Sequence, residues 1–440
     1  MNALNTFVDY LRFKEANISD FQYEKAKETL LDYLGVAYAG SKENNASFES
    51  FVSGFANDGQ KIIGSKKTFN CYDACFINAF NAHSLELDDG SRFGMIHLGA
   101  SIISSLISLN FIHRLDNSSL LNGIVLGYEA ACRVACSIQP FHKRMGFHTS
   151  GTCGTIGASI ACAVALKMND DQIKRVLSCS CSSASGLLEI QEQSSMLKPF
   201  NLAQAAVNGL RCALFGLSKF EYPDDMLCGE RGFLRVFSND NVDFKKLINR
   251  TSSFEIERIY VKPYAACRHC HSPIEAALRL SNMVKVEDVK QINVFVYKDA
   301  IKGHDHIDIS SISSAKLSIP YCVSIALLYK DVGLPMFRGS VFKSAIVNEL
   351  IKKIKIIEDP LLSENAKVKR ASRVEVVTIN GDVFKETIEY AKGDFENPLT
   401  RDELFNKFCG LVDDEQIIEI GKNILYKTNG IDLMKEVMKL

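Results

Sequence analysis

Apolar residues recur with the period of an α-helix along most of the first 250 residues. The segment 20–40, DFQYEKAKETLLDYLGVAYAG, is amphipathic, and Gly40 stands where a C-terminal cap would fall. Segment 70–87 repeats the pattern, with Asn70 as its expected N-cap. Similar patterns over 97–115 and 118–138 predict two more helices, so this part of the chain is expected to be all-helical.

The segment 151–188 is dense in Gly, Ala, Ser and Cys. Small side chains let helix axes approach one another closely, and close-packed interiors favour such contacts. We therefore expect the two helices predicted in this segment to lie at the centre of a helical bundle.

The hydrophobic period changes near residue 253. Strand-like alternation is found over 253–264 and 289–300, and 373–390 reads as a hairpin that turns at Asn380-Gly381. Helical stretches are expected between these strands. They cover 272–284, 314–330 and 342–352.

The helical period returns after residue 395. The predicted fold is therefore mostly α, with a large all-helical domain formed by residues 1–252 and 396–440. A smaller α+β domain, residues 253–395, is inserted before the C-terminal helices.

Composition describes an ordinary globular protein without a strong overall charge. Of 440 residues, 47% are hydrophobic and 23% charged, and 51 Lys and Arg nearly balance 52 Asp and Glu. No global field therefore favours nucleic acid or an anionic membrane. The first residues lack the pattern of a secretory signal, and no run of 18 apolar residues occurs. Fourteen scattered cysteines fit a reducing compartment, so a cytoplasmic location is expected.

An acidic group follows the apolar pattern in NAHSLELDDGSRFGMIHLGA, residues 81–100. If this segment is helical, Glu86 lies one turn from both His83 and Asp89, and Gly90 releases the chain into a loop that reaches His97. Adjacent carboxylates in a pocket cannot both ionise cheaply, so one would have a raised pKa and could donate a proton. A solvated acidic helix end is the alternative, and spacing alone leaves both open.

Single residues further on could also carry chemistry. His148 leads a Gly-, Ser- and Thr-rich loop into a helix whose N-terminal amides could receive a carboxylate, although a lone histidine there is more often a cap or core residue. Lys198 precedes Pro199 in a helix poor in other cations, whereas most lysines are surface residues. Tyr321 lies early in an apolar helix, where core packing is the default.

The densest polar cluster is KPYAACRHCHSPIEAALRL, which begins at Lys262. Its basic residues just before a helix suit the binding of a polycarboxylate. Its cysteines and histidines also suggest zinc, but neighbours at spacings of one to three cannot all turn towards one ion, and no second C-x-x-C pair exists. No phosphate loop, dinucleotide fingerprint or nucleophile elbow occurs at a strand-to-helix junction, so no nucleotide cofactor is expected.

Six of these motifs, taken together and in this order, resemble the MmgE/PrpD family, which includes 2-methylcitrate dehydratase, cis-aconitate decarboxylase and iminodisuccinate epimerase. The motifs span most of the chain. They are NAHSLELDDG with the following HLGA, GFHTSGTCGTIGA, LKPFNLAQAAVNG, VKPYAACRHCHSPIEAAL, AKLSIPYCVSIAL and KGDFENPLTRDELFNKF.

The resemblance implies a large helical domain formed by both ends of the chain, a smaller lid domain and a homodimer. It also implies an active site between the domains, with neither metal nor organic cofactor. Its substrate would be a small polycarboxylate, and its chemistry would move a proton on a carbon next to a carboxylate.

Carried over to this sequence, the resemblance implies two sets of site residues. The expected catalytic residues are Asp88, His97, His148, Lys198, His271 and Tyr321. The expected substrate-binding residues are Glu86, Asp89, Arg92, Arg268 and His269.

The roles follow from the chemistry of each side chain. Lys198 and Arg268, helped by His269, would hold the carboxylates. His97 or His148 would move the carbon-bound proton, with Asp88 orienting the imidazole. His271 and Tyr321 would donate protons from the lid side.

Three departures from the family pattern bear on the substrate. Glu86 replaces the aspartate of decarboxylase-like members, Leu98 replaces a proline, and Ser91 stands where relatives often carry histidine. The longer Glu86 side chain moves its carboxyl group outward, which changes the substrate that fits.

The sequence therefore predicts a lyase that dehydrates or decarboxylates a small di- or tricarboxylate. An epimerase or isomerase of the iminodisuccinate type is the alternative. A catalytically silent polycarboxylate-binding homologue, suggested by Ser91 and Leu98, and a zinc hydrolase using CRHCH also remain open.

Overall fold

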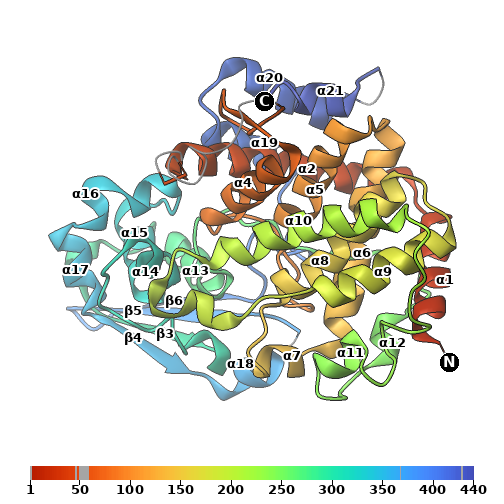
Figure 1. Ribbon diagram of the computed structural model, residues 1–440. Coiled ribbons are helices and arrows are strands. Elements are labelled where there is room, and N and C mark those ends of the chain that lie inside the picture. Colours follow the sequence, from red (N-terminus) through yellow and green to blue (C-terminus); the bar gives the residue numbers. More distant parts are fainter. Residues whose placement is uncertain (1, 45–46, 49–58, 367, 428–429) are drawn as a thin grey trace. The chain divides into compact units, whose positions relative to one another are not determined.

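The fold consists of two compact units. A computed structural model describes residues 2–44, 47–48, 59–366, 368–427 and 430–440 (Figure 1). One unit comprises Met1–Tyr260 with Thr400–Leu440, and the other comprises Val261–Leu399. The first is helical apart from one short two-stranded sheet, and the second combines helices with a four-stranded sheet, so the predicted mostly α fold is confirmed. Within the described ranges, no helix combines the length and apolar character that a membrane crossing requires.

The core of the first unit is built around α8 (Thr149–Ala165), in which every residue is buried. It packs against α6 (Asn117–Ile138), α10 (Lys198–Gly216) and α5 (Gly99–Ile112). Small side chains of α8 permit these close contacts, as the sequence predicted. The second helix of the small-residue segment, α9 (Asp170–Ser183), flanks α8 and α10 and exposes its acidic first turn.

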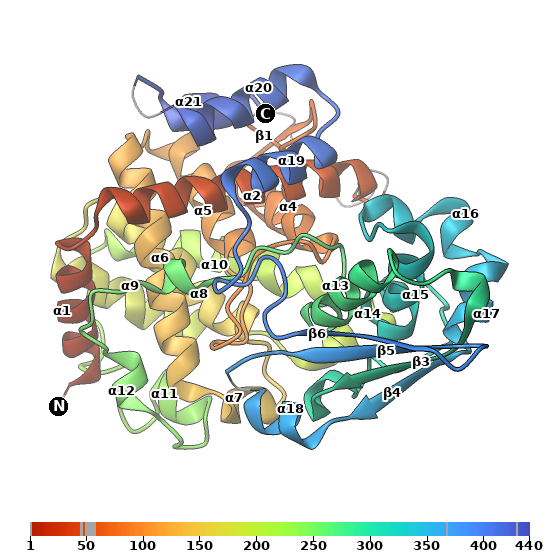
Figure 2. The same ribbon diagram turned by 180° about the vertical axis from the view of Figure 1, so that it is seen from behind.

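Helix α2 (Asp20–Asn44) runs through Gly40, so the predicted helix end at this glycine is wrong. A Cβ atom on Gly40 would lie 2.1 Å from the carbonyl oxygen of Asn81 in α4 (Cys71–Ser84). The glycine therefore allows two helices to touch. Helix α19 (Arg401–Leu411) lies along α2 (Figure 2), which brings the C-terminal segment into the helical unit.

Smaller elements complete the first unit. The predicted N-cap is confirmed, since the Asn70 side chain accepts hydrogen bonds from the amides of Tyr72 and Asp73. All fourteen cysteines lie in the described ranges, and none forms a disulfide. The remaining elements are α1 (Ala3–Glu15), β1 (Gln60–Lys61), β2 (Thr68–Phe69), α7 (Phe141–Arg144), η1 (Leu188–Ser194), α11 (Phe233–Val236), α12 (Phe244–Leu247), η2 (Glu255–Arg258), α20 (Glu415–Tyr426) and α21 (Leu433–Val437).

The predicted strand over 253–264 is wrong. Residues Glu255–Arg258 form the short 3-10 helix η2, and Tyr260 makes an isolated antiparallel bridge with Gly90. Phe254, Glu255 and Ile256 are all buried in the helical unit, where η2 packs against α6 and Glu255 forms an ion pair with Arg133. The alternating pattern of apolar and polar residues in this segment therefore belongs to a loop that is buried against helices.

The second unit contains a sheet of order β4-β3-β5-β6. The central strand β3 (Val289–Val296) is parallel to β4 (Ile354–Glu358) and antiparallel to β5 (Ser372–Thr378). Strand β6 (Val383–Ile388) completes the predicted hairpin, and Gly381 adopts the positive φ of 92° that its turn requires. Strand β4 had not been predicted.

Helices α13 (His271–Leu280) and α15 (Ile319–Tyr329) pack together, and α13 also contacts β5 and β6. This packing gives the second unit its own apolar core, to which Val294, Val374 and Val376 contribute fully buried side chains. Its other elements are η3 (Arg268–Cys270), η4 (Val286–Asp288), η5 (Lys298–Ala300), α14 (Ile312–Leu317), η6 (Leu334–Phe337), α16 (Gly339–Phe342), α17 (Ala345–Ile351) and α18 (Pro360–Asn365).

Candidate functional site

The acidic segment is not helical. Helix α4 ends at Ser84, and Glu86 has a positive φ of 55°, so the predicted one-turn spacing of Glu86 and Asp89 is wrong. A left-handed residue turns the chain instead and directs the next carboxylates inward. Asp88 is 2% exposed and Asp89 is 3% exposed, which excludes a solvated helix tip for these two residues.

Asp88 lies between two imidazoles. Its Oδ2 is 2.8 Å from Nδ1 of His83 and 3.2 Å from Nδ1 of His97, and the two rings meet edge to face with centroids 4.6 Å apart. Burial alone would raise the pKa of Asp88. The charges and hydrogen bonds of the two histidines outweigh that effect and hold the pKa well below its ordinary value, so this carboxylate is ionised at neutral pH.

The surroundings of His97 fix which of its nitrogens carries the proton. Its Nδ1 lies 2.8 Å from the main-chain oxygen of Asp89 and 3.2 Å from the carboxylate of Asp88. Both neighbours are acceptors, so Nδ1 is the donor, and Nε2 is the nitrogen that can act as a base when the ring is neutral. The His97 amide donates to Oγ of Ser150 at 3.0 Å, which anchors the residue near the start of α8.

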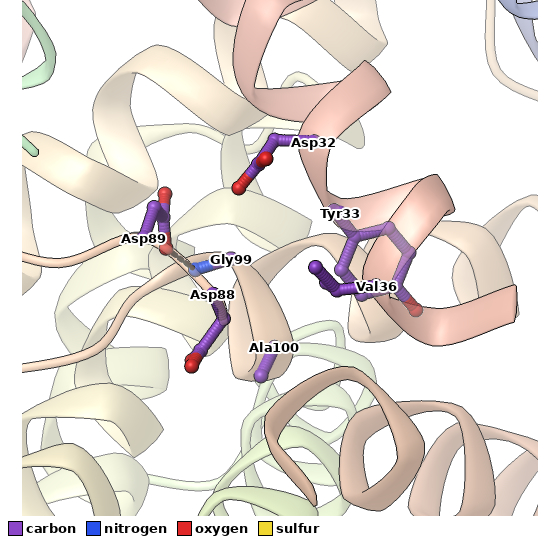
Figure 3. A pocket seen from close by; sticks show the side chains of 7 residues that line it. All are labelled: Asp32, Tyr33, Val36, Asp88, Asp89, Gly99 and Ala100. Atoms are coloured by element: carbon purple, nitrogen blue, oxygen red, sulfur yellow. Dashed lines mark hydrogen bonds between the residues drawn. The ribbon is translucent and has the colours of Figure 1, made fainter. Parts of the chain in front are cut away.

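Asp89 is held by two donors from the helical unit. Its Oδ1 accepts the amide of Gly99 at 2.9 Å, and its Oδ2 accepts the hydroxyl of Tyr128 at 2.5 Å. Burial raises the pKa of Asp89 to about 7, although both hydrogen bonds lower it. The carboxyl group borders a small pocket between α2 and the start of α5 (Figure 3). The pocket is lined by Asp32, Tyr33, Val36, Asp88, Asp89, Gly99 and Ala100.

Lys407 of α19 ties the acidic segment to α2. Its ammonium group forms a buried ion pair with Asp32 and donates to the main-chain oxygen of Leu87 at 2.9 Å. A single cation therefore neutralises one carboxylate of the pocket and fixes the backbone next to Asp88. The sequence had singled out neither Asp32 nor Lys407.

His148 occupies the N-cap position of α8 and is buried, but its side chain makes no capping hydrogen bond. Its Nδ1 lies 2.9 Å from Nδ2 of Asn201, which also donates to the main-chain oxygen of Leu187 at 3.2 Å. The Leu187 carbonyl can only accept, so it fixes the amide orientation and makes His148 Nδ1 an acceptor. The proton of the neutral ring is therefore on Nε2.

The charge state of His148 follows from its environment. Burial lowers the pKa of His148 well below its ordinary value, and the neighbouring charges of Lys198, His83 and His97 lower it further. The ring is therefore neutral near pH 7. It presents an N–H donor at Nε2, whereas the proton of His97 at Nδ1 faces Asp88 and the Asp89 carbonyl.

Lys198, the first residue of α10, forms an ion pair with Glu86. The two side chains are only 18% and 16% exposed, so this lysine is not an ordinary surface residue. Oε1 of Glu86 is also 3.7 Å from Nε2 of His83. The contact joins the acidic segment to a helix that begins more than 100 residues later in the chain.

The helical unit thus brings together most of the predicted site residues it contains. They are Glu86, Asp88, Asp89, His97, His148 and Lys198. Arg92 is buried with its guanidinium 4.8 Å from the Phe93 ring centre, and its predicted role remains a prediction.

Besides Asp32 and Lys407, sequence reasoning missed three supporting residues: His83, Tyr128 and Asn201. His83 had been noted only for its spacing to Glu86. Asn201 could have been found, because it follows Lys198 by three residues on the same helix and so shares its face. Tyr128 lies in an apolar helical stretch and gave no signal.

In the second unit, Arg268 forms a buried ion pair with Asp394. His269 places its Nδ1 2.6 Å from the hydroxyl of Tyr297. Nε2 of His271 is 3.1 Å from the main-chain oxygen of Ala266. These are the contacts of residues held firmly in place, and their predicted parts in catalysis remain predictions.

Tyr321 is fully buried in α15. Its hydroxyl donates to the main-chain oxygen of Met336 at 2.6 Å, and burial raises its pKa above the usual range. This arrangement is that of a core tyrosine with a satisfied hydroxyl. For Tyr321 to donate a proton to a substrate, as predicted, its hydroxyl would have to give up the hydrogen bond to Met336.

Comparisons with known proteins identify the family of the chain. The model of the MmgE/PrpD N-terminal domain matches residues 2–245, and that of the MmgE/PrpD C-terminal domain matches residues 264–420. A cis-aconitate decarboxylase from Mus musculus is 20% identical over 423 residues, which cover 90% of this chain and 83% of the relative. The two domain models together account for most of the chain, which therefore belongs to the MmgE/PrpD family.

Proposed function

We propose that this protein is a lyase that removes water or carbon dioxide from a small di- or tricarboxylate, such as 2-methylcitrate or cis-aconitate. The reaction would move a proton at a carbon next to a carboxylate and would need no metal or organic cofactor. The observation that carries the proposal is the contact of 3.2 Å between Nδ1 of His97 and the ionised carboxylate of Asp88. Membership of the family and the name of the relative support a lyase.

His97 is the proposed base. Its Nε2 would take the proton from the carbon, and the electron pair left on that carbon would spread into the adjacent carboxylate. The imidazolium that forms would lie 3.2 Å from the Asp88 carboxylate, which stabilises it. Asp88 would remain ionised throughout and act as a positioning residue.

His148 and Lys198 are proposed to stabilise the negative charge that builds up. The neutral His148 ring would donate its Nε2 proton in a hydrogen bond to a carboxylate oxygen. The ammonium group of Lys198 would bind a substrate carboxylate while it keeps its ion pair with Glu86. A neutral donor beside a cation favours an anionic intermediate without consuming the proton that His97 carries.

The fate of the intermediate decides the product. In dehydration, the electron pair forms a carbon–carbon double bond while hydroxide leaves and takes up a proton, which the predicted donors His271 and Tyr321 would supply. In decarboxylation, the carbanion-like intermediate arises without prior removal of a carbon-bound proton: the carbon–carboxylate bond breaks, carbon dioxide leaves, and His97, protonated from solvent, donates its proton to carbon. Arg268 remains a proposed carboxylate-binding residue, and the role of His269, the homodimer and the cytoplasmic location remain predictions.

Incubation in heavy water with 2-methylcitrate, cis-aconitate, citrate and iminodisuccinate tests the proposal. We expect NMR to show one substrate converted to an unsaturated product or to a decarboxylated product that carries solvent deuterium. Exchange of iminodisuccinate with inversion alone would indicate the epimerase. Binding of these anions without exchange or product would contradict the lyase and indicate a silent homologue.

A further inference from the structure

A thiol and two imidazoles converge in the second unit. The ligand atoms of Cys267, His269 and His304 all lie within 4.8 Å of one another, and each residue is half-buried. Cys267 and His269 come from the loop around η3, whereas His304 comes from the turn after η5. The cluster thus combines two segments that are well separated in sequence.

This geometry differs from the zinc site that the CRHCH motif suggested. Neighbouring residues of that motif do turn away from one another, since Cys270 Sγ is 3.7 Å from the main-chain oxygen of Leu317 and His271 faces that of Ala266. Only alternate members, Cys267 and His269, reach the same place. His304, which the sequence had not singled out, supplies the third ligand.

We propose that Cys267, His269 and His304 bind a zinc ion and leave one coordination position for water or an anion. Sγ of Cys267 and Nε2 of His304 are 3.2 Å apart. Tetrahedral zinc with its usual bonds of about 2.3 Å to sulfur and about 2.0 Å to nitrogen would hold these atoms about 3.5 Å apart. A movement of a few tenths of an ångström therefore admits the ion once the thiol has lost its proton.

The partners of the two histidines favour coordination. Nδ1 of His304 is 3.0 Å from the main-chain oxygen of Lys302, so this nitrogen carries the proton and Nε2 faces Cys267 as a lone pair. Nδ1 of His269 lies beside the Tyr297 hydroxyl, which can accept a hydrogen bond from it, so coordination would use Nε2. Histidines that bind metals usually donate a hydrogen bond from their second ring nitrogen in this way. A histidine that binds zinc has no nitrogen left for a substrate carboxylate, so this proposal replaces the carboxylate-binding role predicted for His269.

Both loops are fixed to the same short stretch of chain. The Cys267 amide donates to the main-chain oxygen of Lys316, and the amide of Ile319 donates to that of His304, each at 2.8 Å. These anchors flank the end of α14 and hold the ligands in place before an ion arrives. Such preorganisation lowers the cost of ordering the site on binding.

A cysteine nucleophile activated by His304 is the competing interpretation. Such a nucleophile needs donors for the oxyanion that develops beside it. The amide of Cys267 is already bonded to Lys316, and the second imidazole approaches the same thiol, as a metal site requires. Zinc therefore explains all three side chains.

The cluster of His83, Asp88 and His97 also has ligand-type side chains. Their contacts of 2.8 and 3.2 Å place Nδ1 protons against the Asp88 carboxylate. Hydrogen bonds already account for this group, and no ion is proposed there.

Zinc titration of the full-length protein, first treated with a chelator, tests the site. We expect one equivalent of zinc to bind with a Kd below about 1 µM, measured by calorimetry and metal analysis. Cys267→Ser and His304→Gln should each weaken binding at least 100-fold. His306→Gln is the matched control, because this nearby histidine contacts the main-chain oxygen of Ser314 and should leave zinc affinity unchanged.

Cobalt in place of zinc should give a thiolate charge-transfer band that Cys267→Ser abolishes while circular dichroism stays unchanged. The absence of saturable zinc binding, or equal affinities in His304→Gln and the unaltered protein, would overturn the proposal. Rapid alkylation of Cys267 without zinc binding would overturn it in favour of the nucleophile. These readouts do not depend on lyase activity, so failure of the zinc site and failure of the proposed function are separable.

Discussion

Replacing Asp88 by asparagine keeps the shape of the side chain and removes its charge. The carboxylate lies 3.2 Å from Nδ1 of His97. At an effective dielectric constant of about 20, opposite unit charges at such a distance attract by about 5 kcal/mol. If about half of this attraction develops as His97 takes the proton, the barrier rises by about 2–3 kcal/mol and kcat falls about 100-fold.

Steady-state kinetics on the substrate found in heavy water measures this effect. KM should change little, because Asp88 is proposed to act through His97 and not to touch the substrate. Glu129→Gln is the matched control, since it removes a buried carboxylate that contacts Tyr10 and Arg133 in a different network. A folded Asp88→Asn protein with kcat within threefold of the unaltered enzyme would refute the role given to Asp88.

Three further predictions concern neighbouring residues. Lys198→Met should lower kcat/KM by at least 100-fold because it removes the carboxylate-binding cation, and near-normal kinetics would contradict this role. Asn201→Asp should place an acceptor at His148 Nδ1, move the ring proton there and lower kcat; nitrogen-15 NMR would show an unchanged tautomer if this reasoning is wrong. Asp89 binds a proton more tightly in the folded state, where its pKa is about 7, than in the unfolded chain, where it is about 4. Its contribution to the free energy of unfolding should therefore fall by about 3 kcal/mol between pH 4 and 7. Asp89→Asn should remove that fall in denaturant titrations, and equal pH dependence of both proteins would contradict it.

Periodicity predicted the helices well because an amphipathic stripe and a helix cap both depend only on residues that are close together in the sequence. Asn70 is an example, since its side chain bonds amides two and three positions away. Gly40 shows the limit of this reasoning. The same residue that often caps a helix serves here as a contact with Asn81, and only the position of the other helix decides between the two uses.

The second unit shows a similar limit. The hairpin around Gly381 is local and was predicted, whereas the five-residue strand β4 depends on β3, more than 50 residues earlier. The false strand before Tyr260 alternates in residue type and not in burial, because Glu255 is buried together with Phe254 and Ile256. Alternating residue types become a strand only when a partner edge is available.

The sequence predicted which residues belong to the candidate site better than it predicted how they are arranged. Spacing suggested that Glu86 and Asp89 share a helix face, but the turn at Glu86 separates them and places Glu86 against Lys198. Contacts over such sequence distances follow from tertiary packing. The opposite tautomers of His97 and His148 likewise depend on the Asp89 and Leu187 carbonyls, which no motif specifies.

The most direct test of the proposed chemistry is the rate at which the enzyme exchanges the substrate's carbon-bound hydrogen with heavy water, followed by proton NMR. His97→Gln should lower this exchange at least 100-fold while calorimetry shows that the substrate still binds, because only the proton acceptor has been lost. Exchange at the unaltered rate in a folded His97→Gln protein would contradict the central claim that His97 moves the proton.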